Sequence, residues 1–118
     1  MTCTISARAS EGKAPGSNAI GVQASDASVR WLYEQHFSAV AGDAVAFEAW
    51  PPVTSAKQGC CLHEWLLVQW GTPIGELWDL ERLSEMCIEE RRWSFFMASA
   101  PLRVKGGIAS PPGAIAIF

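Results

Sequence analysis

Histidine is scarce in this sequence, and both clustered positive charge and long apolar runs are missing. Its 9 Lys and Arg against 12 Asp and Glu give a formal net charge of −3. Nucleic acids and anionic membrane surfaces are bound by patches of positive charge, so neither is expected as a partner. No apolar stretch approaches a membrane span of about 18 residues, and no basic segment followed by an apolar core opens the chain. We therefore expect a cytoplasmic protein.

Several motifs of enzyme and metal sites are also missing. The 4 cysteines have no disulfide-framework spacing, so reduced thiols are expected. No second Cys/His pair accompanies Cys60-Cys61-Leu62-His63, which favours buried thiols over a structural zinc site. Serine catalysis lacks a Gly-x-Ser-x-Gly turn, and the Gly106-Gly107 pair lacks the Lys-Ser/Thr of a phosphate loop.

Apolar and aromatic residues are what the chain has in abundance. Hydrophobic residues make up 49% of its 118 residues, and 6 of them are tryptophans. A domain this small cannot place that many indole rings at its centre, so some are expected to face another chain or domain. The tryptophans are Trp31, Trp50, Trp65, Trp70, Trp78 and Trp93.

The first half of the chain predicts a flexible leader, a helix and two short extended runs. Residues 1–19 are rich in Ser, Ala and Gly without apolar periodicity, and the domain is expected to span residues 20–118. Ser25 can cap a helix. Its inward face would carry residues at helical spacing, namely Val29, Leu32, Tyr33 and His36. Residues 39–48 predict two extended runs around a turn, followed by a loop from Pro51 to Gly59.

The central stretch predicts a second helix that buries a histidine. His63 shares helical spacing with Leu66, Leu67 and Trp70, so its imidazole should lie on the buried face and need a partner. Gly71 and Pro73 end this helix, and residues 72–77 predict a strand that carries Glu76. His63 and Glu76 would then lie on consecutive elements that are neighbours in space.

The last third predicts a helix from Asp79 to about Arg91 and two strands. The nearly uncharged run of residues 93–102 is typical of a strand buried on both faces, and residues 114–118 form a short final strand. This alternation predicts an α/β fold with a mixed sheet flanked by about three helices. Weak sheet edges indicate that the sheet continues into further chain.

Spaced blocks from Gly21 to the C-terminus resemble a known family. They include Ala-Val-Ala-Gly-Asp, Phe-Glu, His-Glu-x-Leu-Leu, Ile-Gly-Glu-x-Trp-Asp-Leu, Phe-Phe-x-x-x-Ala-Pro-Leu and Ala-Ile-Ala-Ile. The pattern is similar to the C-terminal part of the cyclase family that includes the metal-dependent kynurenine formamidases of tryptophan catabolism. The resemblance implies a swivelling β/β/α fold and hydrolysis of small-molecule amides with zinc or manganese.

The family's metal ligands are assigned by this resemblance to two regions. An upstream His-x-Gly-Thr-His-x-Asp block with a further histidine supplies three ligands and the catalytic histidine, and nothing in this sequence matches it. The remaining two ligands match His63 and Glu76. The sequence contains one other histidine, His36, and no catalytic residue is assigned. We therefore expect the chain by itself to be inactive.

Simpler interpretations stay open for these residues and for the chain. From spacing alone, His63 can be a core histidine hydrogen-bonded to backbone, and His36 can cap a helix C-terminus. The alternative function is a non-catalytic binding or assembly module. Such a module would pair through its sheet edge and tryptophans with itself, as a homo-oligomer, or with a related full-length chain.

Overall fold

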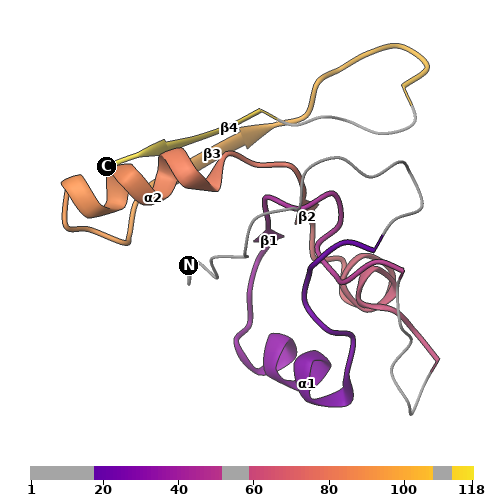
Figure 1. Cartoon of the computed structure of the whole chain (residues 1–118). Helices are drawn as coiled ribbons and strands as arrows, with labels where there is room; N and C mark the ends of the chain where they lie inside the picture. Colours follow the sequence, from indigo (N-terminus) through magenta and orange to yellow (C-terminus); the bar gives the residue numbers. More distant parts are fainter. Residues whose placement is uncertain (1–17, 52–58, 108–112) are drawn as a thin grey trace. The chain divides into compact units, whose positions relative to one another are not determined.

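The computed structural model describes residues 18–51, 59–107 and 113–118 (Figure 1). Contacts between residues divide the described chain into two compact units. The first unit ends at Leu80, and the second unit begins at Glu81. Most of the predicted leader and part of the loop between Pro51 and Gly59 lie outside the described residues. Ala19, at the end of that leader, is paired with Trp50 through two backbone hydrogen bonds of 3.0 Å.

The first helix, α1, spans Asp26–Glu34 and begins at the predicted cap. The Ser25 hydroxyl oxygen accepts from the Ser28 backbone N–H at 3.1 Å, which satisfies one of the first-turn donors. Leu32 is buried as predicted, but Tyr33 and His36 are exposed. The prediction of an inward His36 is wrong because α1 ends at Glu34 and His36 adopts a φ of 53°, which takes it out of helical phase.

Two short strands pair the middle of the first unit with the region near its C-terminal end. Strand β1, Val40–Ala41, pairs in parallel with β2, Ile74–Gly75, in the register Val40 to Ile74 and Ala41 to Gly75. The pairing is extended by a 2.9 Å hydrogen bond from the Gly42 N–H to the Gly75 carbonyl. The first extended run predicted within residues 39–48 and the strand predicted at residues 72–77 are therefore present but short, and β2 ends immediately before Glu76. The second run predicted within residues 39–48 forms no strand, and Glu48 makes only an isolated bridge with Val22.

The helix that carries His63 is wider than the predicted α-helix. Leu62 and His63 are α-helical, and residues Glu64–Gln69 continue the helix as the π-helix η1. Hydrogen bonds of the i→i+5 type widen each turn beyond the roughly 3.6 residues of an α-helix, so the buried face follows Leu62 and Leu66 rather than the i, i+3, i+4 pattern that starts at His63. Leu66 is accordingly 1% exposed while Leu67 is 48% exposed. The prediction that both leucines face inward is therefore wrong for Leu67.

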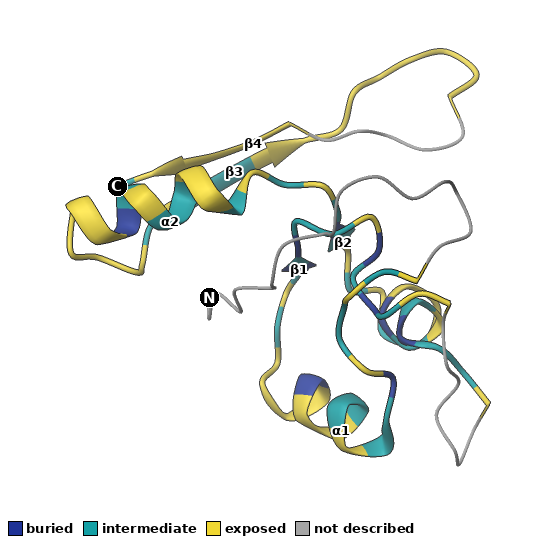
Figure 2. Cartoon of the chain, in the orientation of Figure 1, coloured by how far each residue is buried: buried dark blue, intermediate teal, exposed yellow. Residues whose placement is uncertain are grey.

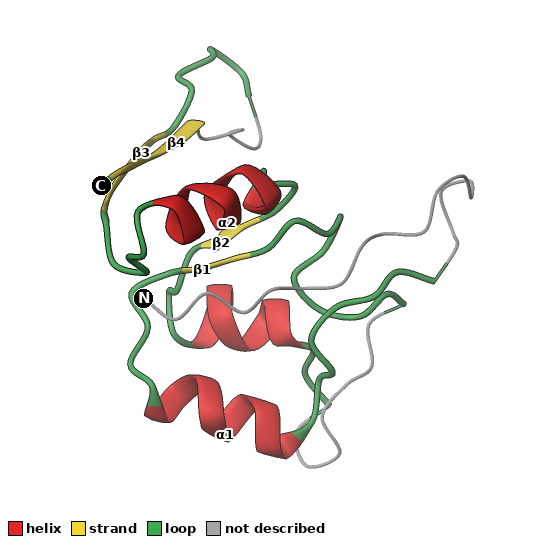
Figure 3. Ribbon diagram, turned by 60° about the vertical axis from the view of Figure 1, so that its left-hand side comes forward, coloured by secondary structure: helices red, strands yellow, loops and turns green. Residues whose placement is uncertain are grey.

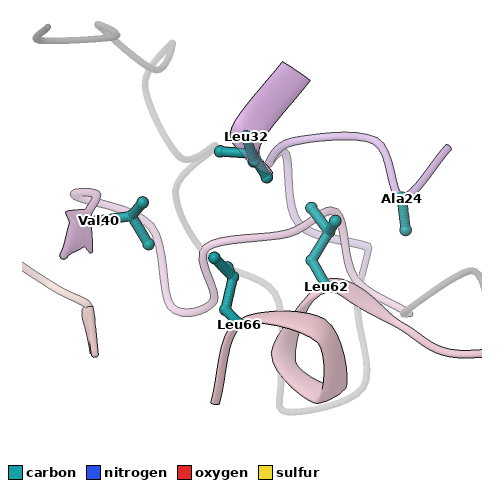
Figure 4. Close-up of a cluster of buried hydrophobic side chains, with 5 residues drawn as sticks. All are labelled: Ala24, Leu32, Val40, Leu62 and Leu66. Carbon is teal, nitrogen blue, oxygen red and sulfur yellow. The ribbon is translucent and has the colours of Figure 1, made fainter. Parts of the chain in front are cut away.

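The core of the first unit anchors the N-terminal half of this helix. Leu62 and Leu66 are fully buried beside Leu32 of α1 and Val40 of β1 (Figure 4), and α1 and η1 lie side by side in Figure 3. His63 is thus fixed in sequence between two core leucines. Removal of a buried leucine side chain costs about 2–5 kcal/mol, so the backbone that carries His63 is held by a strong constraint.

The second unit contains α2 and an antiparallel pair of strands. Helix α2 spans Leu80–Glu89, close to the predicted bounds, and Cys87 is buried. Strand β3, Phe96–Ala100, pairs with β4, Gly113–Ile117, with Phe96 opposite Ile117. The described residues therefore form two two-stranded sheets, one parallel and one antiparallel, where the sequence predicts a mixed sheet.

The β3–β4 pair is the point at which predicted burial fails. Phe96, Ile115 and Ile117 are each more than half exposed, and Figure 2 shows both strands largely in the colour of exposed residues. A lack of charge indicates that a strand can be buried, but it does not supply the layer that buries it. Among the described residues, no helix has the length and apolar character needed to cross a membrane.

The C-terminal end of η1 provides a test of the fold. Gly71 has a φ of +66°, and no heavy atom lies within 4 Å of the position that an added Cβ would take, so Gly71→Ala adds conformational strain without a clash. We expect the free energy of unfolding to fall by about 1–2 kcal/mol, measured by urea denaturation. Gly42→Ala is the matched control, because its Cβ would make only ordinary contact, 4.0 Å from the Ala44 nitrogen. Equal losses in both variants would contradict the assigned helix end.

Candidate functional site

Two carboxylate side chains from separate segments of the first unit meet at one histidine. His63 Nδ1 lies 2.6 Å from Glu48 Oε1, and His63 Nε2 lies 3.0 Å from Glu76 Oε1. The structure thus brings together the two residues that the sequence singles out, His63 and Glu76. It adds a second carboxylate, Glu48, on the opposite side of the imidazole ring.

Glu48 is the residue that sequence reasoning missed. It is 1% exposed, and its carboxylate accepts hydrogen bonds from the Leu62 N–H at 2.7 Å and the His63 N–H at 3.1 Å. These N–H groups open the helix that continues as η1, so Glu48 caps that helix from 14 and 15 positions away. One signal in the sequence could have indicated it, because Glu48 is a lone carboxylate at the end of an apolar run. A carboxylate that is buried with such a run needs hydrogen-bond or charged partners.

A close backbone approach holds Glu48 in place. The Val22 N–H donates to the Phe47 carbonyl and the Ala49 N–H donates to the Val22 carbonyl, both at 3.0 Å. At Gly21 an added Cβ would lie 2.3 Å from the Glu48 carbonyl carbon. Only glycine fits there, and its absence of a side chain lets the entering chain pack directly on the segment that carries Glu48.

Glu76 is held by the turn that follows β2. Leu77 adopts a φ of 56°, and its N–H donates to the Ala44 carbonyl at 3.1 Å. The Phe47 N–H donates to Glu76 Oε1 at 3.2 Å. Leucine in the left-handed region costs roughly 1–2 kcal/mol, so the surrounding hydrogen bonds stabilise a turn that aims Glu76 at the histidine.

The site has a buried side and an open side. The Glu48 side chain is 2% exposed, whereas the side chains of His63 and Glu76 are each 33% exposed. The Nδ1 edge of the ring therefore faces the protein interior, and the Nε2 edge lies beside Glu76 where solvent can enter. A ligand or ion that approaches from solvent would meet Nε2 and the Glu76 carboxylate.

The donor and acceptor count of this cluster is unbalanced when the ring is neutral. A neutral imidazole has a single N–H, and an ionised carboxylate only accepts. If Nδ1–H donates to Glu48, the Nε2 lone pair and a Glu76 oxygen face each other at 3.0 Å. Two electron-pair donors at this distance attract a cation, which can be a second proton or a metal ion.

The pair offers two of the ligand types that zinc uses. Zinc lies about 2.0–2.2 Å from histidine nitrogen and carboxylate oxygen ligands and holds them tetrahedrally, so two of its ligands are roughly 3.4 Å apart. His63 Nε2 and Glu76 Oε1 are 3.0 Å apart, so a bound zinc would need these two atoms to separate slightly. Imidazole and carboxylate also suit manganese.

A complete metal site needs more ligands than this pair. A catalytic zinc uses about three protein ligands. Within the described residues, no group of three His, Cys, Asp or Glu side chains is arranged to hold a metal ion. Glu48 does not serve as the third ligand here, because it occupies the Nδ1 side of the ring, opposite Glu76.

The remaining candidate residues lie outside this cluster. His36 is exposed in the turn after α1, with its ring 6.2 Å from that of Tyr33. Cys60, Cys61 and Cys87 are thiols rather than disulfides, as predicted. Burial is the main cause that raises the pKa of the Cys61 thiol, which favours its protonated, less nucleophilic form.

Comparison with solved structures shows a cyclase-like fold. A protein described as a novel cyclase matches with a TM-score of 0.70 and 33% sequence identity over 87% of this chain. The matched region is 32% of that protein's chain, so the present chain spans about a third of its length. No protein-family model matches this sequence, and no curated protein matches it.

The contact between Gly21 and Glu48 generates a prediction for the site. Gly21→Ala would force the Glu48 backbone away, because its Cβ would lie 2.3 Å from the Glu48 carbonyl carbon. We expect a stability loss of about 1–3 kcal/mol and altered NMR chemical shifts for the Leu62 and His63 amides. Gly42→Ala should leave these two amides unchanged. Unshifted amides in the Gly21 variant would show that Glu48 does not depend on this packing.

Proposed function

We propose that this chain is the C-terminal portion of a metal-dependent amide hydrolase of the cyclase family. His63 and Glu76 would be two of its metal ligands. The observation that carries the proposal is the 3.0 Å pair of Nε2 and Oε1, with the other ring nitrogen already bonded to Glu48. The likeness to the novel cyclase supports the same assignment. The other ligands would be those of the His-x-Gly-Thr-His-x-Asp block, in the swivelling β/β/α arrangement that the family resemblance implies.

The residues of this chain would bind and orient rather than transfer protons. His63 contributes a neutral nitrogen ligand and Glu76 a charged oxygen ligand, while Glu48 keeps the ring in place. Zinc or manganese bound there would polarise the carbonyl of a formamide or related amide and activate water for attack. The acid–base histidine belongs to the upstream block, so an aryl formamide would be turned over only when that block is supplied.

Metal titration tests the ligand assignment directly. We expect isothermal titration calorimetry of the chain with Zn²⁺ to show weak binding, because two ligands are fewer than a catalytic zinc site uses. His63→Ala and Glu76→Gln should abolish that binding. His36→Asn is the matched control, since it removes the other histidine from an exposed turn. Binding that survives both site substitutions would overturn the assignment.

Activity provides a second check on the same proposal. The purified chain should not hydrolyse an aryl formamide. Hydrolysis that is abolished both by a chelator and by His63→Ala would contradict the view that the chain lacks the catalytic group.

The assembly-module alternative is favoured by a different observation. Phe96 is 68% exposed and Ile117, its partner across the strands, is 51% exposed. Exposed apolar residues clustered in this way favour a surface that another protein covers. A metal-free oligomer would support assembly as the function, whereas a metal-bearing particle would support the hydrolase.

Light scattering after size-exclusion chromatography measures this alternative. If the β3–β4 pair mediates assembly, Phe96→Glu should lower the particle mass, because it places a charge in the apolar surface. Ser99→Glu adds the same charge to the same strand on its opposite face, and it should have no effect. Equal masses for the wild type and both variants would argue against assembly through the Phe96 face.

A further inference from the structure

We propose that Glu48 is the positioning residue of this site. It fixes the orientation and tautomer of His63 so that Nε2, rather than Nδ1, is the ring atom presented beside Glu76. The role of Nε2 as a metal ligand rests on the proposed function. The fixation of the ring rests on the geometry of this chain alone.

The contacts at Glu48 determine which nitrogen carries the proton. Its carboxylate is buried and already accepts from two backbone N–H groups, at 2.7 Å and 3.1 Å. Either carboxylate, when ionised, can only accept, but the ring lies 2.6 Å from the buried Glu48 and 3.0 Å from Glu76, whose exposed side can bind water instead. The closer carboxylate, which has no access to water, therefore takes the ring hydrogen. A neutral His63 therefore carries its proton on Nδ1 and has its lone pair on Nε2.

The same carboxylate also fixes where the ring is. Glu48 Oε1 contacts both the His63 backbone N–H and His63 Nδ1. Backbone and ring of one residue are thus tied to a single oxygen atom, which restricts rotation of the side chain. Histidine ligands of metals commonly donate their second N–H to a carboxylate in this way, and loss of that carboxylate weakens metal binding.

Glu64 provides a control on the same helix end. Its Oε2 accepts from the Cys61 N–H at 2.8 Å, and the residue is exposed. The described contacts of Glu64 involve no atom of the His63 ring. Glu64→Gln therefore removes one negative charge and weakens one N-terminal cap, as Glu48→Gln does, but leaves the ring contact intact.

Nitrogen-15 NMR of the imidazole reports the tautomer without any metal. The sequence has 2 histidines, so a His36→Asn background leaves His63 as the single source of ring signals. At a pH where the ring is neutral, we expect the proton on Nδ1, and the same result with Glu64→Gln. Glu48→Gln should move the proton toward Nε2, because a neutral amide is a weaker acceptor than the Glu76 carboxylate, which then favours a hydrogen on Nε2.

Two results would overturn the ring fixation. One is a neutral wild-type ring that carries its proton on Nε2. This result can be obtained even if the variants do not fold. The other is a folded Glu48→Gln variant in which the proton stays on Nδ1.

Zinc titration then connects the ring to the metal. We expect Glu48→Gln to weaken Zn²⁺ binding about 10- to 100-fold, with Glu64→Gln close to the wild type. If a Glu48→Gln variant has the reversed tautomer but the same affinity for Zn²⁺, Glu48 does not position His63 for metal binding. If the wild type binds no Zn²⁺ while its proton lies on Nδ1, the proposed function fails and the ring fixation stands.

Discussion

The buried carboxylate of Glu48 is the interaction on which the first unit depends. Transfer of a carboxylate out of water costs several kcal/mol unless hydrogen-bond donors replace the solvent. Here the donors are two backbone N–H groups at the start of a helix and one ring nitrogen, all within 3.1 Å. Without the carboxylate, each of these donors would lack this hydrogen-bond acceptor. The carboxylate and its donors therefore satisfy one another, which offsets the cost of their burial. The helix start, the ring and the segment packed on Gly21 are consequently fixed together.

This arrangement gives the histidine two different edges. The buried edge contacts Glu48, whereas the other edge lies beside Glu76, whose side chain is one-third exposed. The parallel β1–β2 pair and the strained turn at Leu77 place the Glu76 carboxylate there. A histidine held only for packing needs one hydrogen-bond partner, but this ring is clamped between two carboxylates. That second carboxylate accepts from the Phe47 N–H, and its position beside Nε2 makes the site suitable for a cation.

Local signals in the sequence predicted the elements well and their surroundings less well. Ser25 and Gly71 mark helix ends through backbone chemistry that depends only on neighbouring residues, and both ends are where they are expected. Glu48 could not be predicted as a helix cap, because its partners are 14 and 15 positions away and no periodicity connects them. The exposure of Leu67 was missed because helical spacing presupposes an α-helix, whereas η1 is a π-helix. The exposure of Phe96 was missed because an uncharged strand does not reveal whether another layer of the fold covers it.

The two candidate functions account for different amounts of the structure. Assembly explains the exposed apolar side chains of β3 and β4, but it gives no reason for an imidazole between two carboxylates. A hydrolase completed by further protein explains both features. Such protein would provide the missing metal ligands, and a larger fold would also have more surface with which to cover the strands. The novel cyclase, of which this chain matches 32%, is a fold of that larger size. The hydrolase proposal is therefore the more economical of the two, since one further portion of protein would satisfy both the metal pair and the apolar strands.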